Sequence, residues 1–491
     1  GRWQDPPLSP ALVSGAGRGR SAGRMPNVTF ILDTSCSMNM RVAGGLTLLD
    51  CAKSAIENFI KARGRDIAGS RADRYMLVTC EEGPGALKAY DVFPFKAFQR
   101  ALKVTRARDL TALGPALKRA LDVLNLHRLA AGVDTYGNGL NPFNIDPATI
   151  ILLTDGTELT SAQGATDILR LPMDPTPGSE LTKEPFRWDQ RLFSIVLKIA
   201  ATGTAELGGA EGEQVATSLT PMCEVMGGKC TTVTSLKSLL QNMEVIAQRV
   251  SQPTVVVGYQ RLPAPGSWGD GAGEQQTAWA PHILYTQRSQ ANHGLWPIPE
   301  AFWLDPGLAR LPSREAQPTI SFLPIEADPY IPPGFPVDKY DLEEVPMTAL
   351  MSAAAQGSER GACWQVFVQN SKIRGEAGEP FGFLRLNRAA TGVALYILPY
   401  NYPVLWKLLD QLAGLPPMKK LDPPSQWRGE LERYISGIPP AYAASLRTAF
   451  KKMGVGSHVI PEVRDGGLGF PVSSYLHKLQ LQAKLQAKYP M

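Results

Sequence analysis

Between Met25 and about Val250, short apolar runs alternate with amphipathic stretches of helical periodicity. The runs lie at 28–32, 75–78, 149–153, 193–199 and 230–233, and each is apolar enough for a strand that is buried on both faces. Apolar residues at helical spacing predict helices over 49–60, 113–124 and 236–246. Strands that alternate with helices form βαβ units, so residues 26–250 are predicted to be an α/β domain with a doubly wound, mainly parallel sheet.

The pattern changes after Pro253 to short β-like runs that are broken by Pro and Gly. These runs, at 254–259, 282–286, 319–322, 364–369 and 393–398, predict a β-rich, barrel-like domain over 251–400. Helical periodicity returns from Tyr402, with stretches at 404–412, 427–435, 442–453 and 473–488, and predicts a helical region over 401–491. Residues 1–25 are rich in Gly, Arg, Pro and Ser and lack the apolar core of a signal peptide, so we expect a disordered extension there.

The composition narrows the class of protein. Of the 491 residues 44% are apolar and 19% charged, and no run approaches the roughly 20 apolar residues of a membrane span. A net charge of +5, without a block of Lys and Arg interleaved with aromatic residues, argues against direct nucleic-acid binding. The six cysteines are scattered without a CxxC pair, so we expect reduced thiols in an intracellular protein rather than a secreted adhesion module.

A polar turn, Asp33-Thr-Ser35-Cys-Ser37, follows directly on the first apolar run. Its carboxylate and two hydroxyls alternate along the chain, so all three can point oxygens at one place, and oxygen is the ligand that Mg²⁺ prefers. Two of these ligands are neutral, which would leave positive charge on the metal for a carboxylate from another protein.

Two later segments can reach the same edge of the predicted sheet. Thr111 begins a TxxGxAL segment just before a helix, and Asp155 follows the apolar run 149–153 in a Thr-Asp-Gly turn. Ligands in open α/β sheets lie at the carboxyl ends of the strands, where both residues are expected. The competing interpretation is that Ser35 or Thr111 only caps a helix.

Enzymatic interpretations have weaker support. A haloacid dehalogenase-type phosphatase also places an Asp after its first strand, but it needs a second Asp where this chain has Ser35. No GxxxxGK[ST] phosphate loop is present. A Mg²⁺-dependent, phosphatase-like hydrolase that uses Asp33 stays as the alternative to a non-catalytic protein.

The three elements in this order resemble the metal-ion-dependent adhesion site of von Willebrand factor A domains. The resemblance implies that Asp33, Ser35, Ser37, Thr111 and Asp155 bind Mg²⁺, directly or through water.

Longer segments resemble one family more closely. They are DRYMLVT at 73–79, PGSELTKEPFRWDQRLF at 177–193, TPMCEV at 220–225 and LPYNYPVL at 398–405. Together they are similar to the family of Integrator complex subunit 6 and its close paralogue. The resemblance implies a nuclear, non-catalytic scaffold or adaptor that contacts other Integrator subunits. It also implies recruitment of protein phosphatase 2A to RNA polymerase II, for transcription attenuation or termination and for small nuclear RNA 3′-end processing.

The segment before the fourth apolar run is a candidate protein interface. It carries charged and aromatic side chains, among them the Arg and Trp that often anchor interfaces: Lys183, Glu184, Phe186, Arg187, Trp188 and Asp189. The alternative is a loop that packs on its own domain.

Overall fold

The structure is a computed structural model of the whole chain. It describes residues 26–42, 44–66, 73–108, 110–131, 147–156, 159–161, 164–166, 176–200, 217–250, 254–261, 282–285, 307–325, 331, 337–343, 351, 363–368, 379–387, 391–398, 402–436, 446–448, 450–452, 455, 458 and 469–488. The expected extension at residues 1–25 therefore lies outside the described residues.

A six-stranded sheet forms the core of the first half of the chain, in the order β3-β2-β1-β4-β7-β8. Its strands are β1 (Asn27–Leu32), β2 (Arg74–Thr79), β3 (Leu87–Val92), β4 (Ala148–Thr154), β7 (Gln190–Leu197) and β8 (Cys230–Val233). Every neighbouring pair is parallel except β2 and β3, which are antiparallel. The α/β fold with a mainly parallel sheet is confirmed, and β3 adds the antiparallel edge.

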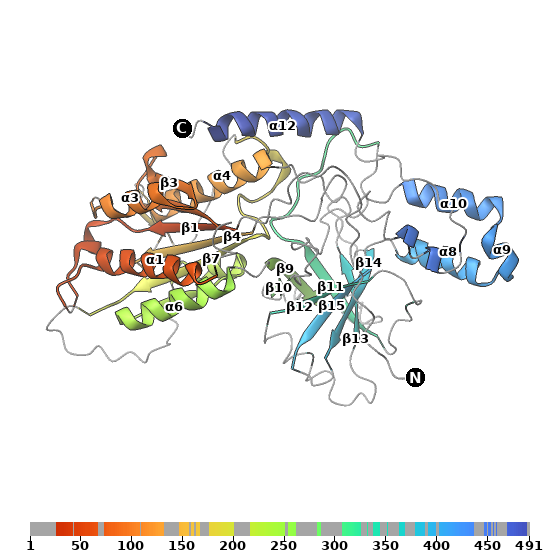
Figure 1. Cartoon of the computed structure of the whole chain (residues 1–491), viewed down its shortest axis with the longest axis horizontal. Helices are drawn as coiled ribbons and strands as arrows, with labels where there is room; N and C mark the ends of the chain where they lie inside the picture. Colours follow the sequence, from red (N-terminus) through yellow and green to blue (C-terminus); the bar gives the residue numbers. More distant parts are fainter. Residues whose placement is uncertain are drawn as a thin grey trace, which may run out of the picture. The chain divides into compact units, whose positions relative to one another are not determined.

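Helices cover both faces of this sheet (Figure 1). One face packs against α1 (Leu48–Gly64), α3 (Lys96–Val104) and α6 (Leu236–Arg249), through a core that includes Phe30, Phe59 and Phe98. The other face packs against α4 (Leu113–Ala131) and α5 (Thr220–Val225), through residues such as Leu117 and Leu152. Because both faces are covered, the central strands are apolar along their length. These apolar runs are the feature from which the sequence predicted the strands.

The chain reverses its direction of travel across the sheet between β1 and β4. From β1 it runs to β2 and β3 on one side, and it then returns to β4, β7 and β8 on the other. Neighbouring parallel strands that continue in opposite directions leave a crevice at their carboxyl ends, where ligands of open α/β sheets bind. The Asp33 turn follows β1 and the Thr154-Asp155-Gly156 turn ends β4, so both lie at this crevice.

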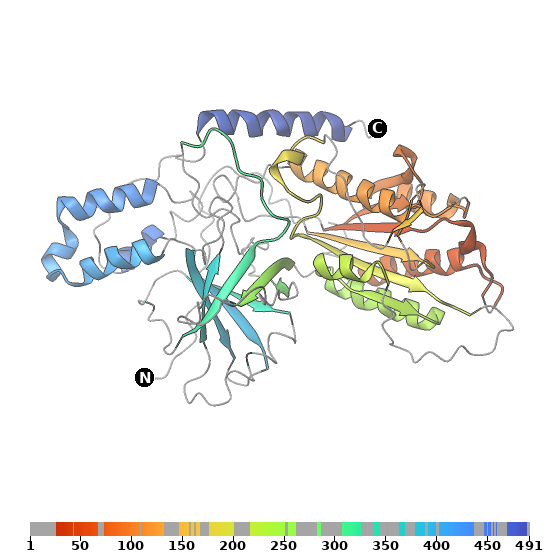
Figure 2. The same cartoon turned by 180° about the vertical axis from the view of Figure 1, so that it is seen from behind.

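A closed barrel follows, and Figure 2 shows it from behind. Its strand order is β10-β12-β15-β14-β13-β11-β9. Its strands are β9 (Thr254–Arg261), β10 (His282–Tyr285), β11 (Thr319–Ile325), β12 (Asp338–Leu342), β13 (Cys363–Val368), β14 (Glu379–Leu386) and β15 (Val393–Ile397). The β-rich, barrel-like architecture is confirmed. Strands β12 and β14 carry Asp, Lys, Glu, Pro or Gly within them, which explains why their sequences did not predict strands.

Helices follow the barrel, as predicted. Those within the described residues include α8 (Tyr402–Ala413), α9 (Pro417–Leu421), α10 (Ser425–Ser436) and α12 (Phe470–Lys488), and much of the predicted stretch 442–453 lies outside them. Trp427 of α10 is buried and donates its indole N–H to the carbonyl oxygen of Leu408 in α8, at 2.9 Å, which holds these two helices together. The predicted domain limits at 250 and 400 stay a prediction. The structure divides into two compact units, and one boundary between them falls within β9, between Val256 and Val257.

Candidate functional site

Asp33 is the buried centre of the site, with no exposed surface. Its backbone N–H donates to the Leu153 carbonyl oxygen at 2.9 Å, which continues the β1–β4 ladder for one more residue. The next residue, Thr34, accepts a hydrogen bond from the Arg108 N–H through its carbonyl oxygen. These backbone bonds fix the turn between β4 and the segment that follows α3.

Both oxygens of the Asp33 carboxylate accept hydrogen bonds. Oδ1 accepts from the backbone N–H of Ser35 at 2.9 Å and from the Thr111 hydroxyl at 3.4 Å. Oδ2 accepts from the Thr154 hydroxyl at 2.6 Å. The structure therefore brings Thr111, which is 78 residues away in sequence, to the Asp33 carboxylate. The sequence predicted that Thr111 lies at this edge of the sheet.

The two serines extend the cluster towards the surface. The hydroxyl oxygens of Ser35 and Ser37 lie 2.8 Å apart, and Ser35 is buried whereas Ser37 is exposed. The Ser35 hydroxyl makes no capping hydrogen bond to the short helix at Cys36–Asn39 that follows. The row of oxygens thus runs from the buried Asp33 to the exposed Ser37. A metal ion bound there would be open to solvent on one side.

Asp155 lies close enough for its negative charge to act on Asp33. Burial is the main cause that raises the pKa of Asp33 above 3.8, and the charge of Asp155 raises it further. Hydrogen bonds from Thr154 and Ser35 act in the opposite direction. The exposed Lys198 donates from its Nζ to the Asp155 carbonyl oxygen at 2.8 Å, which brings a positive side chain to the rim.

This donor set fits a hard divalent cation. Two carboxylates and three hydroxyls offer oxygen alone, and in the described part of the chain no basic side chain forms an ion pair with Asp33. In that part no group of three His, Cys, Asp or Glu side chains is placed to hold a metal ion, so the cluster differs from carboxylate-rich or zinc-type sites. The assignment of Mg²⁺ to Asp33, Ser35, Ser37, Thr111 and Asp155 stays a prediction.

Thr154 and Lys198 belong to this site but were not identified from the sequence. Thr154 was part of the Thr-Asp-Gly turn, and its role depends on adjacent parallel strands that end in register. It also accepts the Gly156 N–H at 3.0 Å, so one hydroxyl shapes its own turn and holds Asp33. Lys198 follows β7, the next strand along, and only the strand order could indicate its position.

The candidate interface segment is mostly packed against its own unit. Trp188 has no exposed surface, and two guanidinium groups lie over its ring, with Arg128 at 4.7 Å and Arg187 at 5.2 Å from the ring centre. Arg128 also pairs with Asp189, and both Arg187 and Asp189 are buried.

The side chains of Arg187, Trp188 and Asp189 are thus largely buried in their own unit, and their assignment to a protein interface stays a prediction. Lys183, Glu184 and Phe186 are half-buried, and their assignment to an interface stays a prediction.

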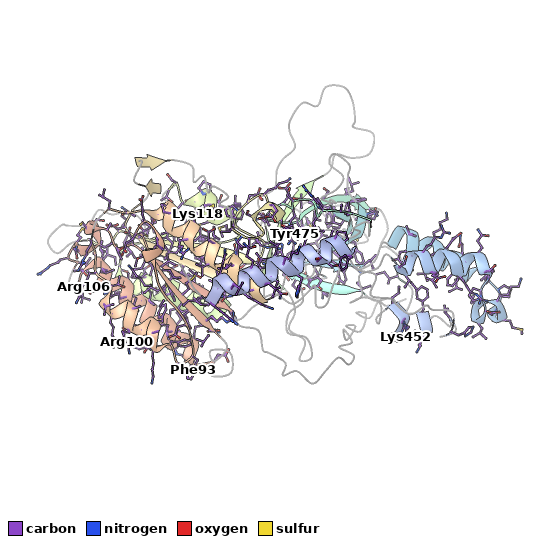
Figure 3. The ribbon with its side chains drawn as sticks, turned by 90° about the horizontal axis from the view of Figure 1, so that it is seen from above. Phe93, Arg100, Arg106, Lys118, Lys452 and Tyr475 are labelled. Atoms are coloured by element: carbon purple, nitrogen blue, oxygen red, sulfur yellow. The ribbon has the colours of Figure 1, made fainter. Side chains whose placement is uncertain are left out.

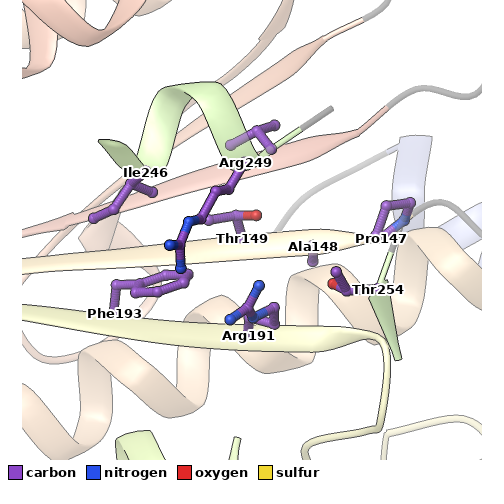
Figure 4. Close-up of a pocket in the computed structure, with 9 residues that line it drawn as sticks. Pro147, Ala148, Thr149, Arg191, Phe193, Ile246, Arg249 and Thr254 are labelled. Atoms are coloured by element: carbon purple, nitrogen blue, oxygen red, sulfur yellow. The ribbon is translucent and has the colours of Figure 1, made fainter. Parts of the chain in front are cut away.

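A small hollow lies at the opposite end of the sheet from Asp33 (Figure 4). It is lined at the amino ends of β4 and β7 by Thr149 and Phe193, and from α6 by Ile246 and Arg249. Arg191 also lines it, with its guanidinium 4.9 Å from the centre of the Phe193 ring and its Nε donating to the Gly227 carbonyl oxygen at 2.9 Å. This arginine is used in packing.

The cysteines are free, as expected. Five of the six thiols are buried, and Cys36 in the Asp33 turn is exposed. In the described residues no helix has both the length and the apolar character that are needed to cross a membrane.

Comparison with known proteins identifies two domain families. Residues 28–158 match the von Willebrand factor type A domain, and residues 272–414 match the INTS6 beta-barrel domain. These ranges include β1 to β4 and most of the barrel, so the two halves of the fold have separate matches.

Curated relatives match nearly the whole chain. Integrator complex subunit 6 of Homo sapiens is 42% identical over 476 residues, which is 94% of this chain and 53% of that protein. Integrator complex subunit 6-like of Homo sapiens is 41% identical over 85% of this chain and 50% of its own length. The Integrator complex subunit 6 homolog of Dictyostelium discoideum is 39% identical over 93% of this chain and 40% of its own length. The chain thus spans about half the length of the curated relatives that it matches.

Solved structures show more distant likeness. A von Willebrand factor type A protein from Catenulispora acidiphila aligns with 47% of this chain and 43% of its own, at 13% identity and a TM-score of 0.27. The SpRpn10 VWA domain aligns with 44% of this chain and 95% of its own, at 11% identity and a TM-score of 0.26. Because these scores are low, the fold assignment rests on the strand order and on the two domain families.

Proposed function

Because the chain belongs to the family of Integrator complex subunit 6, we propose that it is a non-catalytic scaffold subunit of the Integrator complex. The observation that carries the proposal is the extent of the match. It covers 94% of the chain and includes the A-type sheet, the barrel and the helices that follow. A match of this extent supports a shared role for the whole arrangement, whereas an A domain by itself occurs in proteins of many functions.

In this proposal the chain acts in the nucleus and contacts other Integrator subunits. It helps to bring protein phosphatase 2A to RNA polymerase II, and so contributes to transcription attenuation or termination and to small nuclear RNA 3′-end processing. It reaches the polymerase indirectly, and neither nucleic acid nor a membrane is a direct partner. The relatives are named as subunits of a complex rather than as enzymes, which supports the non-catalytic role.

The Asp33 site has a defined part in this proposal. Asp33 and Asp155 would hold Mg²⁺ with the hydroxyls of Ser35, Ser37 and Thr111, and the metal, when bound, would supply a position that takes a partner carboxylate. Thr154 and the Ser35 N–H keep the Asp33 carboxylate in one orientation through bonds of 2.6 Å and 2.9 Å. The exposed Ser37 leaves the site open on the side from which a partner approaches.

Affinity purification of the tagged chain from nuclear extract, followed by mass spectrometry, tests the proposal. We expect Integrator subunits and protein phosphatase 2A to be recovered together. An Asp33→Ala, Asp155→Ala variant separates metal-dependent contacts from the rest, and Asp410→Ala, a surface carboxylate on α8, is the matched control. Recovery of neither Integrator subunits nor the phosphatase would contradict the proposal.

The hydrolase alternative is tested on the purified chain. Generic phosphoesters with Mg²⁺ should give no sustained turnover, because Ser35 stands where a haloacid dehalogenase-type phosphatase needs its second Asp. Turnover that Asp33→Asn abolishes would favour the alternative and overturn the scaffold assignment.

A further inference from the structure

The helix α3 presents a basic face that the linear sequence did not reveal. Five Lys and Arg residues and no Asp or Glu lie between Val92 and Arg108. They are spaced by helical periodicity rather than clustered, so they did not stand out as a charge block. Once α3 forms, Lys96, Arg100 and Lys103 recur at intervals of four and three residues and lie on one side of the helix. All three are exposed.

The opposite side of α3 explains why the basic side faces solvent. Phe98 and Leu102 are buried, and the ring of Phe98 lies 5.8 Å from that of Phe30 and 5.6 Å from that of Tyr75. This packing fixes the orientation of the helix on the sheet. Figure 3 shows Phe93, Arg100 and Arg106 along one outer edge of the α/β unit.

The stability of α3 does not account for its charges. Lys96 is the first residue of the helix, where the positive end of the helix dipole disfavours a cation, and like charges four residues apart cost about 0.2–0.5 kcal/mol. Asp91, the nearest acidic residue before the helix, accepts the backbone N–H groups of Ala97 and Phe98 at 2.9 Å and 3.2 Å. Within the described part of the chain the three α3 cations form no ion pair, whereas Arg65, Lys88 and Lys118 each pair with a carboxylate.

The basic face leads to the Asp33 turn. After α3 the chain continues to Arg108, which is exposed and donates its backbone N–H to the carbonyl oxygen of Thr34. Asn39, just beyond the turn, donates from its side chain to the carbonyl oxygen of Ala107 at 3.4 Å. The last basic residue of this series therefore lies beside the candidate metal turn. Arg106 differs from the other basic residues because it interacts electrostatically with the carboxylate of Asp50.

We propose that Lys96, Arg100, Lys103 and Arg108 form a docking track for an acidic segment of a partner protein, which runs along α3 to the Asp33 turn. The argument is charge complementarity, together with the adjacent proposed Mg²⁺ site, whose mostly neutral ligands would leave positive charge on the metal for an incoming carboxylate. Three of the exposed apolar residues beside the track, Val92, Val104 and Leu110, are aliphatic, and the fourth is Phe93. Aliphatic side chains suit a protein segment, whereas single-stranded nucleic acid stacks successive bases on several aromatic side chains.

The proposal rests on the proposed function only in requiring a protein partner, so it is tested on the purified full chain without Integrator. The probe is a fluorescein-labelled Glu-rich peptide that contains a few Leu residues, and binding is followed by fluorescence anisotropy at low salt. We expect Lys96→Glu, Arg100→Glu, Lys103→Glu to weaken binding at least tenfold. The matched control is Lys478→Glu, Lys484→Glu, Lys488→Glu on α12, which changes the net charge equally at exposed positions and should leave binding within twofold.

A second variant and a second probe make each outcome decisive. Lys96→Gln, Arg100→Gln, Lys103→Gln removes the charge without reversing it, and it should weaken binding to a smaller extent with unchanged thermal unfolding. Equal losses in the α3 and α12 variants would show dependence on net charge alone and overturn the proposal. Tighter binding of an oligouridine than of the peptide would assign the track to nucleic acid instead. Absence of peptide binding to the unaltered chain would also overturn it.

Discussion

Asp33 and Asp73 are two fully buried aspartates beside neighbouring strands of one sheet, and their surroundings differ in one respect. Asp73, just before β2, receives two bonds from the guanidinium group of Arg63, at 2.8 Å and 2.9 Å. Asp33, just after β1, receives hydrogen bonds from hydroxyls and a backbone N–H only. The fold itself neutralises Asp73, whereas no basic side chain in the described part of the chain pairs with Asp33, where we propose that a cation from solution binds. This difference separates a structural charge from the proposed metal site.

The largest effect is expected where the internal cation is removed. Arg63→Met should lower the free energy of unfolding by about 3–5 kcal/mol, because Asp73 would be left buried and unpaired. The same change also removes the bond from Arg63 to the Ala247 carbonyl oxygen, which ties α1 to α6. Chemical denaturation of the purified chain measures the loss.

Arg65→Met is the control for this prediction, since it lies on the same turn of the chain. Arg65 pairs with Glu244 at 2.7 Å, but its side chain is 76% exposed. An exposed pair contributes about 0–1 kcal/mol, so Arg65→Met should be nearly neutral. Equal losses for the two variants would show that the burial of the Arg63–Asp73 pair is not what matters.

A smaller effect is expected at the Asp33 end. Thr154→Val keeps the shape of the side chain but removes the donor to Asp33 Oδ2 and the acceptor for the Gly156 N–H. The loss should be about 1–3 kcal/mol, because Asp33 Oδ2 would lose a partner in a buried place and the Gly156 N–H would lose one in a half-buried place. Thermal unfolding in the presence of a chelator gives the comparison without a contribution from metal.

The control is the same Thr→Val substitution at Thr34, the residue next to Asp33. The hydroxyl of Thr34 is buried and has no hydrogen-bond partner among the described residues, so Thr34→Val should be neutral or slightly stabilising. A destabilisation as large as that of Thr154→Val would contradict the importance of the Thr154 hydrogen bonds.

The smallest expected effect is a dependence on pH. Because burial raises the pKa of Asp33 above 3.8, the folded state holds this proton more tightly than the unfolded chain does. Without divalent cations, stability should fall as the pH rises from 3.8 through the raised pKa and then level off. Asp33→Asn should remove this fall from the melting profile. Parallel profiles for the two proteins would show that Asp33 does not carry the effect.

The sequence predicted the sheet because central parallel strands are apolar along their whole length. It therefore missed β3, the edge strand, and α3, whose apolar side is formed by few residues. The five proposed metal ligands could be named because two polar turns follow apolar runs, Thr111 precedes a helix, and the three elements in this order resemble the metal site of von Willebrand factor A domains. Thr154 and Lys198 could not, since their roles depend on strand order and register. Trp188 was ambiguous because the same Arg–Trp stacking that marks interfaces also stabilises a buried loop.

The most direct test of the central claim is a calorimetric Mg²⁺ titration of the purified chain. We predict saturable binding to the unaltered chain and no binding to Asp33→Ala, Asp155→Ala, whereas Thr34→Val should titrate as the unaltered chain does. An unchanged titration in the double variant would show that Asp33 and Asp155 do not hold the metal, and would contradict the contrast with Asp73.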